Sequence, residues 1–147
     1  MGKHGVYILK TFIALLLLFL NLFASNLEIE KKIYKTIIYS LFPHKEIIKV
    51  WSDDKRKKSF LISIQNITIV KNPKNADILI INKPLKHIPN KIIFITNYPI
   101  LEKYKDIAIG GFYWQKGRPN IIFLEKNLKR FHLNLPQSMQ EYIEEDL

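Results

Sequence analysis

Four histidines, His4, His44, His87 and His132, are the side chains best suited to metal binding or proton transfer. No two of them have the i, i+4 spacing of a zinc site on one helix face, and the chain has no cysteine to complete such a set. A metal site would need carboxylates brought in by the fold. The sequence also lacks a Gly-x-Ser-x-Gly elbow, a phosphate-binding Gly-rich loop and a Gly-x-Gly-x-x-Gly fingerprint. We therefore predict no catalytic residue, no cofactor and no metal, and hence no enzyme.

An adjacent pair of carboxylates, Asp53 and Asp54, precedes the basic run Lys55–Lys58. The pair could bind a cation and the run could contact phosphate. No third oxygen ligand follows at the spacing of a calcium loop, however, and a solvated turn has the same composition. We interpret Ser52–Lys58 as a polar turn at the end of a strand.

Aromatic and cationic residues form the most distinctive group in the chain, between Phe112 and Arg118. Exposed Trp, Tyr and Arg often carry most of the energy of a protein interface, because they bury large areas and keep a polar group available. Alternate residues of a strand point to opposite faces, so Phe112 and Trp114 should share one face while Tyr113 takes the other. The alternative is that flanking helices cover both aromatic sets. The predicted partner-binding residues are Tyr113, Trp114, Lys116 and Arg118.

Two β-branched and aromatic runs, Ile107–Trp114 and Asn120–Leu124, flank a turn that carries Gly117 and Pro119, which predicts a β-hairpin. The acidic start and basic end of Glu125–Phe131 favour a short helix. Pro136 should then begin a last helix over Gln137–Glu144.

Earlier in the chain, Ala76–Asn82 and Lys91–Thr96 are continuous apolar runs, which is typical of strands covered on both faces. Other expected strands are Glu46–Trp51 and Asn66–Val70; expected helices are Leu27–Phe42, capped by Asn26 and ended by Pro43, and Tyr98–Lys105, begun at Asn97. This pattern predicts an α/β fold: a single small domain whose mixed sheet is flanked by helices, with a C-terminal hairpin followed by short helices.

The N-terminus has a basic start, with Lys3 and Lys10, before the apolar run Thr11–Ala24. This is the pattern of a secretory signal, and we predict an export signal over residues 1–25 and a domain over residues 26–147. The alternative is an uncleaved inner-membrane anchor, which would contact the membrane through residues 6–24. Both place the domain in the periplasm.

The formal charge of +10 is spread along a chain rich in Ile, Lys and Asn, and we interpret it as compositional background rather than as a nucleic-acid site.

The region from Asn75 to Leu135 resembles the YfiR-like periplasmic proteins. The resemblance rests on Asn75–Ile80, a strand at Ile92–Thr96, Gly110-Gly111 before a strand, Gly117-Arg118 in a turn, Ile122-Phe123, Asn127, Leu133 and Leu135. It implies a small exported α/β domain that acts by binding, similar to the periplasmic repressor of an inner-membrane diguanylate cyclase.

Together these features predict a non-enzymatic periplasmic regulator or sensor accessory that binds the extracytoplasmic domain of an inner-membrane signalling protein, with homodimerisation left open. An alternative is a periplasmic small-molecule binding protein, whose crevice would lie at the carboxyl ends of the strands.

Overall fold

The computed structural model describes the backbone of residues 3–147 and the side chains of residues 12–17 and 26–147. Most of the predicted export signal, and His4, lie outside the residues whose side chains are described. The chain divides into two compact units, Met1–Thr36 and Ile37–Leu147, which are treated separately. Within the described residues, no helix has both the length and the hydropathy needed to cross a membrane.

The first helix, α1 (Lys3–Leu41), is longer than the sequence pattern predicted. Asn26 lies inside this helix, so its predicted role as a helix cap is wrong. The expected end is confirmed, because the helix stops two residues before Pro43, which cannot continue it. The last turn of α1 belongs to the second unit, where Ile37, Ile38 and Leu41 are buried.

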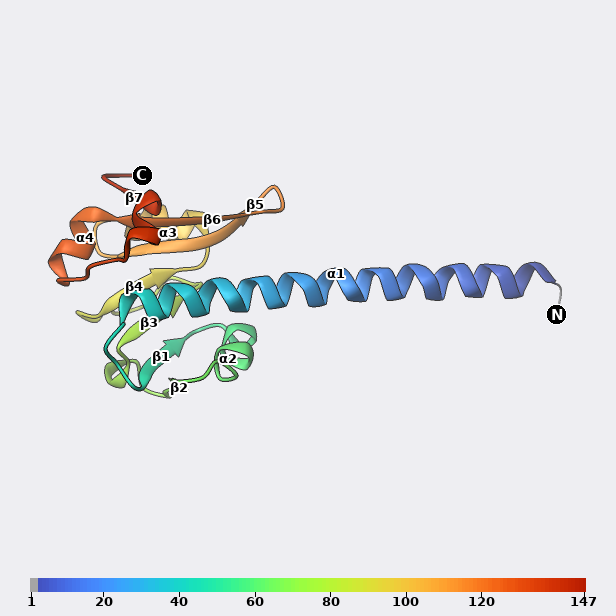
Figure 1. The fold of residues 1–147 in the computed structure, drawn as a ribbon, viewed down its shortest axis with the longest axis horizontal. Coiled ribbons are helices and arrows are strands. Elements are labelled where there is room, and N and C mark those ends of the chain that lie inside the picture. Colours follow the sequence, from blue (N-terminus) through green and yellow to red (C-terminus); the bar gives the residue numbers. More distant parts are fainter. Residues whose placement is uncertain (1–2) are drawn as a thin grey trace. The chain divides into compact units, whose positions relative to one another are not determined.

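A mixed sheet forms the centre of the second unit, with the strand order β2-β1-β3-β4-β5-β6-β7 within the described residues. The first five strands in this order are parallel, β6 runs antiparallel to β5, and β7 is parallel to β6. The strands are β1 (Ile48–Ser52), β2 (Ile67–Ile69), β3 (Ile78–Ile81), β4 (Ile92–Ile95), β5 (Gly110–Gln115), β6 (Arg118–Leu124) and β7 (Ile143–Glu144). The α/β fold with a mixed sheet and a C-terminal hairpin is therefore confirmed (Figure 1).

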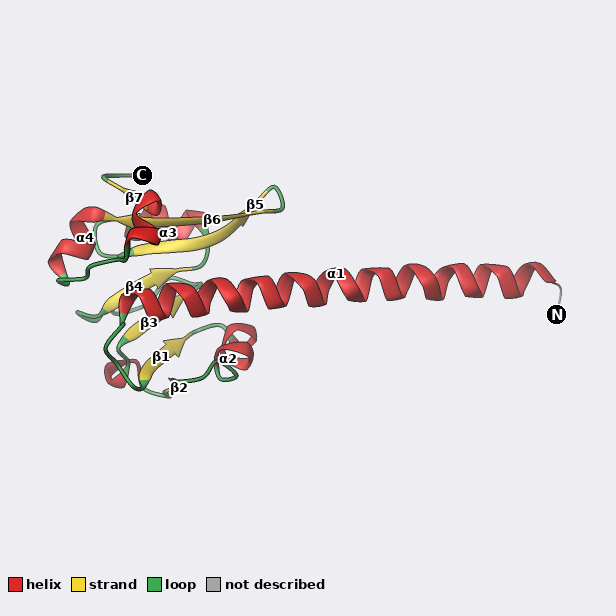
Figure 2. Ribbon diagram, in the orientation of Figure 1, coloured by secondary structure: helices red, strands yellow, loops and turns green. Residues whose placement is uncertain are grey.

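Short helices connect these strands: α2 (Lys55–Leu61), α3 (Tyr98–Tyr104) and α4 (Glu125–Arg130), with the 3₁₀ turns η1 (Pro73–Asn75) and η2 (Gln137–Tyr142) (Figure 2). The crossovers β1–α2–β2 and β4–α3–β5 run in opposite directions along the sheet. Because such crossovers are right-handed, α2 and α3 lie on opposite faces.

Both faces of the central strands are buried, as the continuous apolar runs predicted. All four residues of β3 are inaccessible to solvent. On one face Leu79 and Ile95 pack in a cluster with Leu101 and Tyr104 of α3. On the other face the rings of Phe94 and Phe123 lie 5.9 Å apart.

Two further predictions about local structure are wrong. Ser52–Lys58 is not simply a polar turn: Asp54 accepts hydrogen bonds from the backbone N–H groups of Arg56 and Lys57 and thereby begins α2. The predicted helix Gln137–Glu144 is instead the 3₁₀ turn η2, followed by β7, which pairs with Phe123 and Leu124 of β6.

Candidate functional site

A tight turn closes the β5–β6 hairpin at Lys116 and Gly117, which lie between the paired residues Gln115 and Arg118. Their φ angles are 50° and 73°, both in the left-handed region. Turns of this kind match the twist of antiparallel strands and favour glycine at such a position. Pro119 lies in β6 opposite Trp114 rather than in the turn. Proline is tolerated there because its missing N–H would face away from β5, on a side where β7 does not pair with this part of β6. Figure 1 shows the closed end of this hairpin extending past the end of β4.

The register of the hairpin sorts its side chains onto two faces. Phe112 pairs with Ile121 and Trp114 with Pro119, and these four residues share an apolar face. The pairs Tyr113–Asn120 and Gln115–Arg118 share the opposite, more polar face. The prediction that Phe112 and Trp114 lie on the same face is confirmed, with 5.9 Å between their ring centroids.

The four predicted contact residues therefore do not form one patch. Trp114 lies on the apolar face and is 38% exposed. Tyr113 and Arg118 lie on the polar face, and Lys116 lies in the turn. We call the exposed residues Trp114, Lys116 and Arg118 the hairpin tip.

Tyr113 differs from the hairpin tip in its surroundings. Its ring lies 5.4 Å from that of Tyr98 in α3, and the side chain is half-buried. Burial raises the pKa of Tyr113, and the neighbouring Tyr98 raises it further. The helix α3 covers Tyr113 in part, as expected if flanking helices cover the aromatic residues, whereas Trp114 remains exposed.

The hairpin tip is also cationic. No acidic residue occurs between Ile107 and Leu124. Among the described residues, Lys116 and Arg118 are exposed and make no ion pair. Their charges are therefore available to attract an acidic surface.

The carboxyl ends of the central strands carry a second polar cluster, which the sequence analysis missed. The carboxylate of Asp53 accepts hydrogen bonds from the backbone N–H groups of Asn82 (2.8 Å) and Lys83 (2.7 Å). The side chains of Thr96 and Asn97 donate to Asn82. Polar residues placed directly after predicted strands were the signal available in the sequence.

This cluster satisfies its own hydrogen bonds. Asp53 holds the loop after β3, and Asn97 accepts from the N–H of Ile100 at the start of α3. Within the described part of the chain, no group of three His, Cys, Asp or Glu side chains is arranged to hold a metal ion. The polar groups at this edge of the sheet therefore form hydrogen bonds with one another and with the adjacent backbone.

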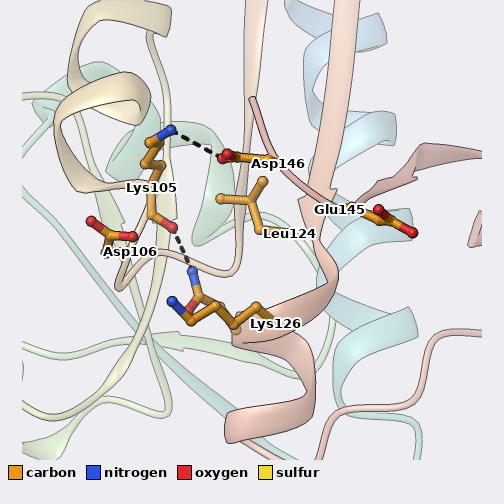
Figure 3. Close-up of a pocket in the computed structure, with 7 residues that line it drawn as sticks. Lys105, Asp106, Leu124, Lys126, Glu145 and Asp146 are labelled. Atoms are coloured by element: carbon orange, nitrogen blue, oxygen red, sulfur yellow. Dashed lines mark hydrogen bonds and ion pairs between the residues drawn. The ribbon is translucent and has the colours of Figure 1, made fainter.

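A polar pocket of about 160 Å³ lies where the C-terminal segment meets the start of α4 (Figure 3). Its lining residues are Lys105, Asp106, Leu124, Lys126, Asn127, Glu145 and Asp146. The buried Asn127 donates from Nδ2 to the backbone oxygens of Lys105 (2.7 Å) and Ala108 (2.6 Å). Among the described residues its Oδ1 has no hydrogen-bond partner.

An exposed ion pair ties the C-terminal segment to this pocket. The ammonium of Lys105 lies 3.1 Å from the carboxylate of Asp146, toward which it points in Figure 3. The hydrogen bond and charge of Asp146 raise the pKa of Lys105. The backbone N–H of Leu147 and then Lys105 lower the pKa of Asp146. We interpret the pocket as the attachment point of the C-terminal segment.

Comparison with known proteins gives no assignment: no family model matches the chain, and neither a curated protein nor a solved structure matches it significantly.

Proposed function

We propose that this protein is an exported, non-enzymatic regulator similar to the YfiR-like proteins. Its α/β domain binds the extracytoplasmic domain of an inner-membrane signalling protein, for which a diguanylate cyclase is the candidate class. Residues 1–25 direct export, and the domain works in the periplasm.

The observation that carries this proposal is the hairpin tip. At the closed end of a hairpin whose base is fixed in the sheet, a partly exposed indole lies on one face, an exposed arginine lies on the other, and an exposed lysine lies in the turn between them. A rigid support lowers the entropy cost of binding, since few groups must be ordered. The indole supplies buried area, and the cations attract an acidic partner.

The proposal is tested by a crosslinking pull-down from native membranes. The full-length chain, tagged at its C-terminus and exported by its own leader, is crosslinked, and co-purified proteins are identified by mass spectrometry. We expect one inner-membrane signalling protein with the wild-type chain and its loss with Trp114→Ala, Arg118→Ala. A matched control is Ile62→Ala, since Ile62 is 64% exposed and lies outside the hairpin. If no specific protein is recovered from cells that export the folded chain, the proposal is wrong.

A further inference from the structure

We infer that the partner adds a β-strand to the open edge of β6, which deepens the proposed function and rests on it. In the described part of the chain, β7 pairs with this edge only at Phe123 and Leu124, and η2, which leads into β7, also contacts β6. Residues Arg118–Ile122 of β6 pair with β5 on one side, and the register gives them no strand on the other. The partner segment we propose is extended and acidic.

The direction of the backbone groups follows from the register. Leu124 donates its N–H to Ile109. Hydrogen-bonded pairs alternate along an antiparallel ladder, so Ile122, Asn120 and Arg118 also face β5. Ile121 must then direct both its N–H and its C=O outward. Pro119 directs only a C=O outward, because proline has no N–H.

The edge already accepts a strand from this chain, since β7 runs parallel to β6 immediately beyond the open segment. An added strand would continue the sheet alongside residues 118–121. Main-chain hydrogen bonds would provide affinity, and alternate side chains would provide specificity, as in other cases of strand addition.

Charge and polarity on the two faces select the partner. On one face the guest strand would lie next to Arg118 and Asn120, which favours acidic or amide side chains. On the other it would lie next to Pro119 and Ile121, beside Trp114, which favours apolar side chains. A second copy of this chain, with a net charge of +10, fits the cationic tip less well than an acidic segment does.

The test compares Ile121→Pro with Ile121→Ala. Both variants remove the isoleucine side chain, but only Ile121→Pro also removes the outward N–H. Because that N–H faces away from β5, its loss breaks no hydrogen bond between β5 and β6. The probe is the purified extracytoplasmic domain of the membrane protein that the pull-down recovers. We expect Ile121→Pro to bind it about tenfold more weakly than Ile121→Ala does. Equal affinities would overturn strand addition and leave docking by the hairpin tip intact.

Hydrogen exchange on the unmodified chain decides the question if Ile121→Pro does not fold. We expect the amide of Ile121 to exchange at least about tenfold more slowly in the complex, while the amide of Asn120, already bonded to β5, changes little. An unchanged rate at Ile121 would overturn the inference. A complex that contains two copies of this chain joined through β6 would also overturn it. Failure of the pull-down itself would remove the proposed function and this inference together.

Discussion

Phe112 and Trp114 lie on the same face of β5 with their rings 5.9 Å apart, yet Phe112 is 2% exposed and Trp114 is 38% exposed. The two aromatic residues thus mark a boundary along one strand. The core of the domain ends at the first ring, and the solvent-exposed end of the hairpin begins at the second.

Substituting these two rings should therefore have opposite effects. Trp114→Ala should weaken partner binding by about 2 kcal/mol or more, about thirtyfold, because a central interface indole is lost. It should change the free energy of unfolding by about 1 kcal/mol or less. Phe112→Ala should lower the free energy of unfolding by about 3–5 kcal/mol, because it leaves a cavity in the core. Urea denaturation and a binding titration separate the two effects, and a Trp114→Ala chain that unfolds as easily as Phe112→Ala would contradict this boundary.

Two glycines of the hairpin provide a matched pair for testing its geometry. A Cβ on Gly110 would lie 2.1 Å from the backbone oxygen of Ile122, whereas a Cβ on Gly117 would meet no atom within 4 Å. Gly110→Ala should therefore separate β5 from β6 and prevent stable folding. Gly117→Ala should cost only about 1 kcal/mol of backbone strain at its φ of 73°. Thermal unfolding of both variants is the measurement. Equal melting temperatures would show that Gly110 does not lie as close to the backbone of Ile122 as described.

The sequence predicted much of this hairpin and of the central sheet. Continuous apolar runs identified β3 and β4, and Asn97 was correctly predicted as the residue that begins α3. In each case local sequence and tertiary burial favour the same structure. The base of the hairpin was predicted equally well, although Pro119 was assigned to the turn and lies in β6.

The errors arose where distant residues decide the local structure. Asn26 resembles a helix cap, but α1 continues through it. The segment Gln137–Glu144 has a helical pattern, but its end pairs as β7 with the edge of β6, which no local signal reveals. The separation of Trp114 from Tyr113 followed from strand alternation, whereas the cover that Tyr98 gives Tyr113 depends on where α3 lies.

The cluster at the carboxyl ends of the strands should be structural. Asp53→Ala leaves the N–H groups of Asn82 and Lys83 without their acceptor, so we expect a loss of about 1–3 kcal/mol in the free energy of unfolding. Glu46→Ala, at an exposed residue, should change it by about 0.5 kcal/mol or less. Partner binding should be the same in both variants.

A thermal-shift screen of periplasmic metabolites tests whether the same cluster binds a small molecule. A solute that raises the melting temperature of the wild-type chain at millimolar concentration, and fails to do so for Asp53→Ala, would support the small-molecule binding protein instead. We expect no such solute.

The attachment of the C-terminal segment should depend on pH only at the extremes. The pKa of Asp146 is lowered from 3.8, so its contribution is present above that value and is lost as the pH falls through the lower pKa of the folded chain. The pKa of Lys105 is raised from 10.5, so its contribution is present below that value and is lost as the pH rises through the higher pKa.

Limited proteolysis of the C-terminal segment should therefore be constant between about pH 5 and 9, apart from the intrinsic pH dependence of the protease. Because the ion pair is exposed, high salt should weaken it. Asp146→Asn should be cleaved faster than the wild-type chain at neutral pH. If the difference in cleavage rate between Asp146→Asn and the wild-type chain changed with pH near neutrality, the role given to the ion pair of Lys105 and Asp146 would be contradicted.

Site-specific photocrosslinking in cells tests the central claim most directly. A photoreactive phenylalanine analogue replaces Gln115, which is exposed at the end of β5, or Ile47, which is 58% exposed just before the amino end of β1. The full-length chain is exported and irradiated, and its adducts are identified by mass spectrometry. The account predicts an adduct with one inner-membrane signalling protein from position 115 and none from position 47. Adducts with that protein from position 47 alone, or from neither position, would contradict it.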